Sequence, residues 1–170
     1  MDHFARLGLP AALDLNAGAL DKAYFARQRQ WHPDRFVAKP AGERARASAE
    51  AAALNDAYRT LKDPLARAVY LASLKGVELP GDGKTIDDPE LLMEAMEARE
   101  ELQEAATVEA VDRMAGRVRE DVKEALSRLG SLFLANDKAA IRKALLRLRY
   151  LDKFGEEARA RRANLERATR

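Results

Sequence analysis

The tripeptide His32-Pro33-Asp34 separates two stretches with helical patterns, and it constrains the fold more than any other feature of the chain. Pro33 has no backbone N–H and disfavours the helical conformation of the residue before it, so the preceding helix should end at Trp31. Asp34 can hydrogen-bond backbone groups further along and tighten the loop. We expect a rigid loop at the tip of a helical hairpin, with an imidazole and a carboxylate at its apex.

Apolar residues at helical spacing lie on both sides of this loop. Before it, Leu20, Tyr24 and Trp31 share one face of a helix over residues 17–31. After it, a helix over residues 41–61 carries a stripe spaced alternately by four and three: Ala47, Ala51, Leu54, Tyr58 and Leu61. Two such stripes should face each other in an antiparallel pair. A short helix with Phe4 and Leu7 precedes the pair, and Asp63-Pro64 opens a further helix that stops at Lys75-Gly76.

The second half of the chain has few helix-breaking residues. Residues 79–84 form the most linker-like stretch, and helix starts are indicated at Asp88-Pro89 and Thr107, with a break at Asn136-Asp137. Apolar positions between Val108 and Leu132 alternate by three and four, which is typical of bundles. We therefore predict an all-α protein with three parts: a domain over residues 1–76, a linker over 77–87 and a three-helix bundle over 88–170.

The helix after Pro89 carries more apolar residues than bundle packing needs. Its core stripe is Leu91, Ala95, Ala98, Leu102 and Ala105, while its side and back carry Leu92, Met93, Met96, Glu97, Glu100 and Glu104. In the last helix, Leu146 and Tyr150 similarly lie off the stripe of Ile141, Leu145 and Leu148. Periodicity leaves two interpretations open. The surplus is either an exposed apolar patch with a carboxylate rim, typical of protein contacts, or part of a wider core stripe.

Composition argues against several kinds of site. The 170 residues carry a net charge of +2, no Cys and only two His, so we expect no disulfide, no metal site and no cofactor. No apolar run approaches the roughly 18 residues of a membrane span. The N-terminus also lacks a signal-peptide pattern, so we expect a cytoplasmic protein without a membrane partner.

The residues disfavour two other functions, catalysis and nucleic-acid binding. His32 and Asp34 could form an acid–base pair, but they lack a nucleophile, a third group and a pocket signature, so we predict no enzyme activity and no catalytic residue. The basic last helix could bind nucleic acid, but it lacks interleaved aromatic residues and a docking motif. We therefore expect protein partners.

The loop with its two facing stripes resembles the J-domain, which activates ATPase chaperones of the seventy-kilodalton heat-shock class. This resemblance covers roughly residues 1–75. Three further strings are similar to the HscB family of J-domain co-chaperones of iron–sulfur cluster biogenesis: DPLARAVYL at 63–71, LLMEAMEAREEL at 91–102 and RLRYLDK at 147–153. The absence of the N-terminal cysteine-rich module of eukaryotic relatives suggests a bacterial-type protein.

The resemblance implies two partners: a dedicated heat-shock ATPase chaperone of the HscA type, and IscU, the scaffold on which clusters are built. The implied chaperone-binding residues are His32, Pro33, Asp34, Lys22, Arg29 and Arg35. The implied client-binding residues are Leu92, Met93, Met96, Glu97, Glu100, Glu104 and Tyr150. A J-domain co-chaperone for a different client remains an alternative, because it would share every residue before Gly76.

The outer side of the second helix departs from the usual J-domain pattern. Many J-domains place several basic residues next to one another there, whereas here Phe25 and Ala26 separate Lys22 from Arg29. Arg35 also stands where Lys often follows the tripeptide. We expect docking to be less electrostatic than in a general J-domain.

Overall fold

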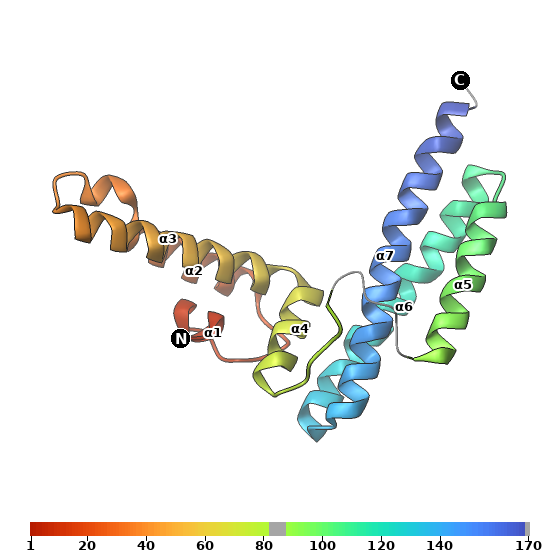
Figure 1. Cartoon of the computed structure of the whole chain (residues 1–170), viewed down its shortest axis with the longest axis horizontal. Helices are drawn as coiled ribbons and strands as arrows, with labels where there is room; N and C mark the ends of the chain where they lie inside the picture. Colours follow the sequence, from red (N-terminus) through yellow and green to blue (C-terminus); the bar gives the residue numbers. More distant parts are fainter. Residues whose placement is uncertain (82–87, 169–170) are drawn as a thin grey trace. The chain divides into compact units, whose positions relative to one another are not determined.

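The fold is all-α, as predicted. The structure is a computed structural model that describes residues 1–81 and 88–168, and within these ranges it contains seven α-helices, one short 3₁₀ helix and no β-strand. None of the helices in these ranges is long and apolar enough to cross a membrane. The chain divides into two units, Met1–Leu74 and Lys75–Arg170, and each is described by itself (Figure 1).

The first unit is built around two long helices, α2 (Ala17–Trp31) and α3 (Ala41–Lys62), which lie side by side and are joined through the 3₁₀ helix η1 (Pro33–Phe36) (Figure 1). α1 (His3–Leu7) packs against both long helices, and α4 (Pro64–Leu74) packs against α3. Three prolines mark helix ends here: α2 ends before Pro33, α3 begins after Pro40, and Pro64 separates α3 from α4. The predicted boundaries are therefore reproduced by local backbone restrictions.

The predicted stripes of α2 and α3 face each other and form the core of this hairpin. Leu20, Leu54 and Leu61 are at most 2% exposed, and the Tyr24 and Tyr58 rings stack with their centroids 4.1 Å apart. Burying one leucine side chain contributes roughly 1.5–3 kcal/mol. The stability of the hairpin thus comes from the stripes, not from the loop at its tip.

The second unit is a bundle of three helices: α5 (Pro89–Glu104), α6 (Val108–Ala135) and α7 (Lys138–Ala168). The predicted breakers mark their ends. Asp88 accepts the backbone N–H of Leu91 at 3.1 Å and caps α5, and Thr107 caps α6 in the same way. Asn136 ends α6 in the left-handed conformation, with φ at 53°.

α7 packs against both other helices of the bundle, and this corrects one expectation. Leu146 and Tyr150 were expected off the core stripe, yet they are only 5% and 7% exposed, and the Tyr150 ring lies 6.2 Å from that of Phe154. A helix covered on two sides buries more than one stripe. Of the two interpretations that periodicity left open, the wider core stripe therefore holds for α7, and the exposed patch does not include Tyr150.

The segment that follows α4 is attached to the second unit. Leu79 packs against the bundle core, and Arg149 of α7 donates a hydrogen bond to the carbonyl oxygen of Pro80 at 2.7 Å. Residues 77–81 of the expected linker therefore belong to the bundle. The remainder of that linker, residues 82–87, lies outside the described residues.

Candidate functional site

The apical loop, residues 32–40, presents His32 and Asp34 to solvent. Their side chains are 52% and 85% exposed. His32 Nδ1 accepts the backbone N–H of Asp34 at 3.3 Å and lies 3.5 Å from Asp34 Oδ2. Short-range contacts across Pro33 thus hold the imidazole and the carboxylate together at the tip of the hairpin, as predicted.

Other residues attach this loop to the helices. Trp31 and Phe36 stack almost parallel with their centroids 6.0 Å apart, and the Arg46 guanidinium lies 5.8 Å above the Trp31 ring. Arg35 Nη1 donates to the backbone carbonyl of Arg29 at 3.1 Å. The sequence analysis did not identify Phe36 and Arg46 as anchors, although the aromatic pair flanking the loop is visible in the sequence. An aromatic stack and two arginines, Arg35 and Arg46, thus attach the loop, although both arginines are themselves exposed.

The outer face of α2, defined here as Lys22, Phe25 and Arg29, continues from the loop. All three side chains are exposed. Among the described residues, Lys22 and Arg29 make no ion pair, whereas Lys62 of the neighbouring helix α3 pairs with Asp21. Two cations without an acidic neighbour on one helical face make that face locally positive.

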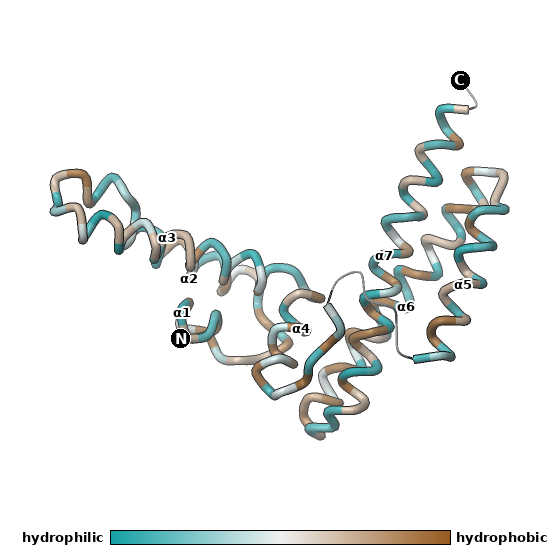
Figure 2. The backbone as a smooth tube through the Cα atoms, in the orientation of Figure 1, coloured by the Kyte–Doolittle hydropathy of each residue, from teal (hydrophilic) through white to brown (hydrophobic). Residues whose placement is uncertain are grey.

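The methionine face lies on α5 and is defined as Leu92, Met93, Met96, Glu97, Glu100 and Glu104. Met93 and Met96 are 64% and 54% exposed, and Leu92 is half-buried. On the opposite side of the helix, Leu91 and Ala95 are buried in the core. The first turns of α5 are its most hydrophobic part (Figure 2). For α5 the exposed-patch interpretation is therefore correct.

The glutamates of α5 fall into two sets. Those that point toward the other helices form ion pairs: Glu90 with Lys143, Glu94 with Arg147 and Glu101 with Arg117. Those of the methionine face, Glu97, Glu100 and Glu104, form none with any described residue. An apolar centre with unpaired carboxylates around it is typical of a surface that contacts another protein.

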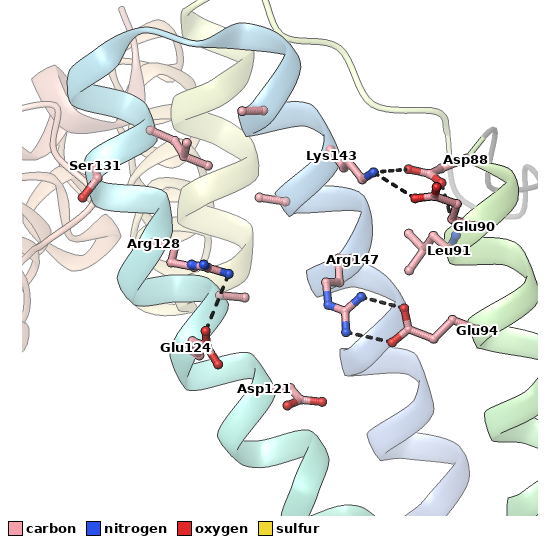
Figure 3. Close-up of a pocket in the computed structure, with 14 residues that line it drawn as sticks. Asp88, Glu90, Leu91, Glu94, Asp121, Glu124, Arg128, Ser131, Lys143 and Arg147 are labelled. Atoms are coloured by element: carbon pink, nitrogen blue, oxygen red, sulfur yellow. Dashed lines mark hydrogen bonds and ion pairs between the residues drawn. The ribbon is translucent and has the colours of Figure 1, made fainter.

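Two bidentate ion pairs fix the rotation of α5 on α7. Arg147 donates to Glu94 through Nη1 and Nη2 at 2.6 and 2.7 Å (Figure 3), and Arg99 donates to Glu157 through Nε and Nη2 at 3.0 and 2.9 Å. Tyr150 lies among these charges, and its pKa is raised by burial and by the Glu94 carboxylate. The pairs keep the methionine face turned to solvent, and sequence reasoning did not find them.

A cleft of about 810 Å³ lies between α5, α6 and α7 beside the Arg147–Glu94 pair (Figure 3). Lys143 lies 3.6 Å from Asp88 and 3.4 Å from Glu90 across it, and Arg128 pairs with Glu124 at 3.6 Å. Each of its cations is thus already paired. Within the described residues, no group of His, Asp and Glu is arranged to hold a metal ion.

Comparisons with known proteins agree with this architecture. The family model described as the HSCB C-terminal oligomerisation domain matches residues 87–159. A "Co-chaperone protein HscB homolog" from Burkholderia multivorans is 39% identical over 167 residues, covering 96% of this chain and 95% of that protein. The chain belongs to the HscB family of co-chaperones. Another HscB homolog, from Cupriavidus taiwanensis, is 42% identical over 156 residues, or 90% of this chain and 89% of that one.

Solved structures of HscB proteins share the whole fold. Chaperone HscB from Vibrio cholerae superposes with a TM-score of 0.86 at 32% identity, covering 97% of this chain and 99% of that chain. Human co-chaperone protein HscB gives a TM-score of 0.87 at 29% identity, covering 94% and 81%. The first unit is therefore a J-domain, and the second is the C-terminal helical bundle of the HscB fold.

Proposed function

We propose that this protein is a co-chaperone of iron–sulfur cluster assembly. It binds the scaffold protein IscU through the methionine face and delivers it to a heat-shock ATPase chaperone of the HscA type. The protein itself forms and breaks no covalent bond, because ATP hydrolysis belongs to the chaperone. Family membership supports the co-chaperone role. The exposed methionines, on a helix whose other side is core, are the observation that carries client binding.

The apical loop would act on the chaperone by contact. His32 and Asp34 are exposed and preorganised, so they can engage a partner with little loss of conformational freedom. In this proposal they favour the chaperone conformation that hydrolyses ATP and closes on its client. Lys22, Arg29 and Arg35 would steer docking to an acidic surface, an effect mainly on the association rate that salt weakens.

The methionine face would supply the affinity for the scaffold. Met93 and Met96 form an exposed apolar centre, and methionine side chains adapt to irregular partner surfaces. The three unpaired carboxylates around them would contribute orientation and rate. Because Tyr150 is only 7% exposed, we propose that it supports α5 from within the bundle core and does not itself contact IscU.

One chain carries both the client-binding and the chaperone-binding surface, and this would bring the client to the ATPase. A client held on the bundle while the J-domain engages the ATPase is present at an effective concentration set by the tether, which reaches the millimolar range for short linkers. The client need not then find the chaperone by free diffusion. Stimulation of hydrolysis should therefore be greatest when both partners are bound.

The test is a steady-state ATPase assay with purified HscA-type chaperone, with and without IscU and the full-length protein. We expect each addition to stimulate hydrolysis and the two together to exceed their sum. Titration calorimetry against IscU measures client binding separately. Stimulation by the protein without any IscU binding would instead favour a J-domain co-chaperone for another client, and a lysate pull-down would then identify that client.

A further inference from the structure

Phe25 is an exposed aromatic residue at the centre of the outer face of α2. Its side chain is 52% exposed, and within the described residues it is the only Phe, Tyr or Trp in the exposed class. Its ring lies against Tyr24 with centroids 5.2 Å apart, at an angle of 57°. Because Leu20 and Tyr24 on the other side of α2 make the contacts with α3, Phe25 contributes no core packing.

The surroundings of Phe25 indicate what covers it. Lys22 precedes it by three residues and Arg29 follows it by four, so one cation lies on each side along the same helical face. Neither cation pairs with an acidic side chain of the described residues. A complementary surface must therefore be acidic at its margins and apolar at its centre.

This face is continuous with the apical loop. Phe25 precedes His32 by seven residues, which is about 10 Å along a helix and returns to nearly the same side. A protein that contacts His32 and Asp34 from this side also covers Phe25. The charge complementarity and this continuity both identify the occupant as the ATPase chaperone and not as the client.

We propose that Phe25 is a specificity-determining residue for chaperone docking, inserting into an apolar recess on an acidic surface of the ATPase. The inference rests on the proposed function and adds the chemistry of the partner surface. An aromatic anchor between two cations replaces part of the long-range attraction with short-range apolar contact. It therefore favours a partner that has the recess over a general chaperone of the same class that offers only acidic charge.

The test compares the full-length wild-type protein with Phe25→Ala, Phe25→Leu and Phe25→Lys. The probes are a purified HscA-type chaperone and a general seventy-kilodalton heat-shock chaperone. The half-maximal concentration for ATPase stimulation is measured with each chaperone at two salt concentrations. Leu134→Ala, at a position 90% exposed in the bundle, is the control for removing an exposed apolar side chain.

With the HscA-type chaperone, we expect Phe25→Ala to raise the half-maximal concentration by about tenfold or more and Phe25→Leu to raise it less. Phe25→Lys should also raise the half-maximal concentration with the HscA-type chaperone and make that concentration depend more strongly on salt. It should reduce the difference in half-maximal concentration between the HscA-type and the general chaperone. Leu134→Ala should match the wild type. Melting temperatures should stay unchanged, because Phe25 makes no core contact.

Three outcomes would overturn the inference or its premise, and they are distinguishable. If the wild type stimulates neither chaperone, the proposed function itself fails. If the wild type stimulates and Phe25→Ala behaves identically, Phe25 is not a docking anchor. If sedimentation shows a wild-type oligomer that Phe25→Ala converts to a monomer with unchanged stimulation, the face contacts a second copy of this chain and not the ATPase.

Discussion

The apical loop presents an imidazole and a carboxylate, whereas the methionine face presents two methionines within a rim of carboxylates. His32 and Asp34 lie outside the core stripes and are held by local contacts, and an aromatic stack attaches their loop to the hairpin. Met93 and Met96 lie on a helix whose opposite side is core, and two bidentate ion pairs set its rotation. In both regions the residues proposed to meet a partner make few of the contacts that attach their element to the rest of the unit. Function and stability should therefore be separable by mutation.

The largest effect is expected at the loop. His32→Gln should abolish stimulation of the chaperone ATPase, because the exposed imidazole is the group presented to the partner. The free energy of unfolding should change by no more than about 0.5 kcal/mol, as at other exposed positions. ATP turnover and a thermal melt measure the two quantities. Unchanged IscU binding is the internal control, and a J-domain unfolded by this substitution would contradict the separation of roles.

The next largest effect is expected at Tyr150, which is buried in the bundle core with the core residues of α5. Tyr150→Ala should destabilise the bundle by about 3–5 kcal/mol, the usual cost of truncating a buried aromatic side chain. Tyr150→Phe keeps the ring and should melt like the wild type. Denaturant titration measures both variants. If Tyr150→Ala left stability unchanged but removed IscU binding, Tyr150 would be a contact residue after all.

The methionine face should show the opposite of Tyr150→Ala, namely a loss of IscU binding without a loss of stability. Met93→Ala with Met96→Ala should weaken IscU binding on the order of 100-fold, because central apolar anchors dominate such interfaces. Stability should change by no more than about 0.5 kcal/mol at each site. Leu92 is left intact because it is half-buried.

Met114→Ala is the matched control for the two exposed methionines. Met114 is 5% exposed, so its truncation should cost about 2–5 kcal/mol of stability and leave the affinity for IscU unchanged. Calorimetry and a thermal melt on the same samples separate the two effects. A large loss of stability in the double variant would show that the exposed methionines are core residues.

A smaller effect is expected at the rim of the methionine face. Replacing Glu97, Glu100 and Glu104 by Ala should lower the association rate with IscU several-fold and reduce its salt dependence, with little change in dissociation. Glu101→Ala on the same helix is the control, because Glu101 pairs with Arg117 outside the face. Stopped-flow kinetics at low and high salt measures the rates. Equal slowing by the control would mean that net charge, and not the rim, is responsible.

The smallest effect is a pH dependence of J-domain stability. Both histidines of the chain lie in the J-domain, so histidine titration affects the stability of this unit and not that of the bundle. Burial, with Arg6 nearby, lowers the pKa of His3 below its usual 6.5, and its ring stacks on Tyr70 at 4.2 Å. A lowered pKa means that folding favours the neutral form. This contribution is present above pH 6.5 and is lost as pH falls through the folded-state pKa.

His3→Phe keeps an aromatic ring but cannot titrate, so it should flatten the loss of J-domain stability on mild acidification. Chemical denaturation between pH 7.5 and about 5.5, a range that spans the usual histidine pKa, measures the difference from the wild type. An identical pH profile for the two proteins would assign the acid sensitivity to other groups.

Helix boundaries could be predicted from the sequence because the signals are local. Pro33, Pro64 and Pro89 restrict their own backbone and that of the preceding residue, whatever the rest of the chain does. Asp88 caps α5 within a few residues of itself. The exposure of His32 and Asp34 follows in the same way, because a loop forced by proline stands apart from both stripes.

The width of each buried face could not be predicted from the sequence, because it depends on how many neighbours cover a helix. Helical periodicity gave the same prediction for the apolar residues off the core stripes of α5 and α7. In the fold, α7 is covered on two sides and buries Tyr150, while the outer side of α5 is left open and Met93 stays exposed. Ion pairing is similarly a property of the packed bundle, since Glu94 and Glu97 have the same chemistry and only Glu94 meets an arginine.

The sequence by itself determined where the helices run, which loop stands at the tip of the hairpin and which α5 residues form its core stripe. Each of these depends on backbone restriction or on the spacing of side chains along one helix. Only the tertiary structure decided that Tyr150 is core and that residues 77–81 belong to the bundle. It also decided that three glutamates and two cations find no ion-pair partner among residues 1–81 and 88–168. These depend on contacts between residues far apart in the chain, which form only when the helices pack.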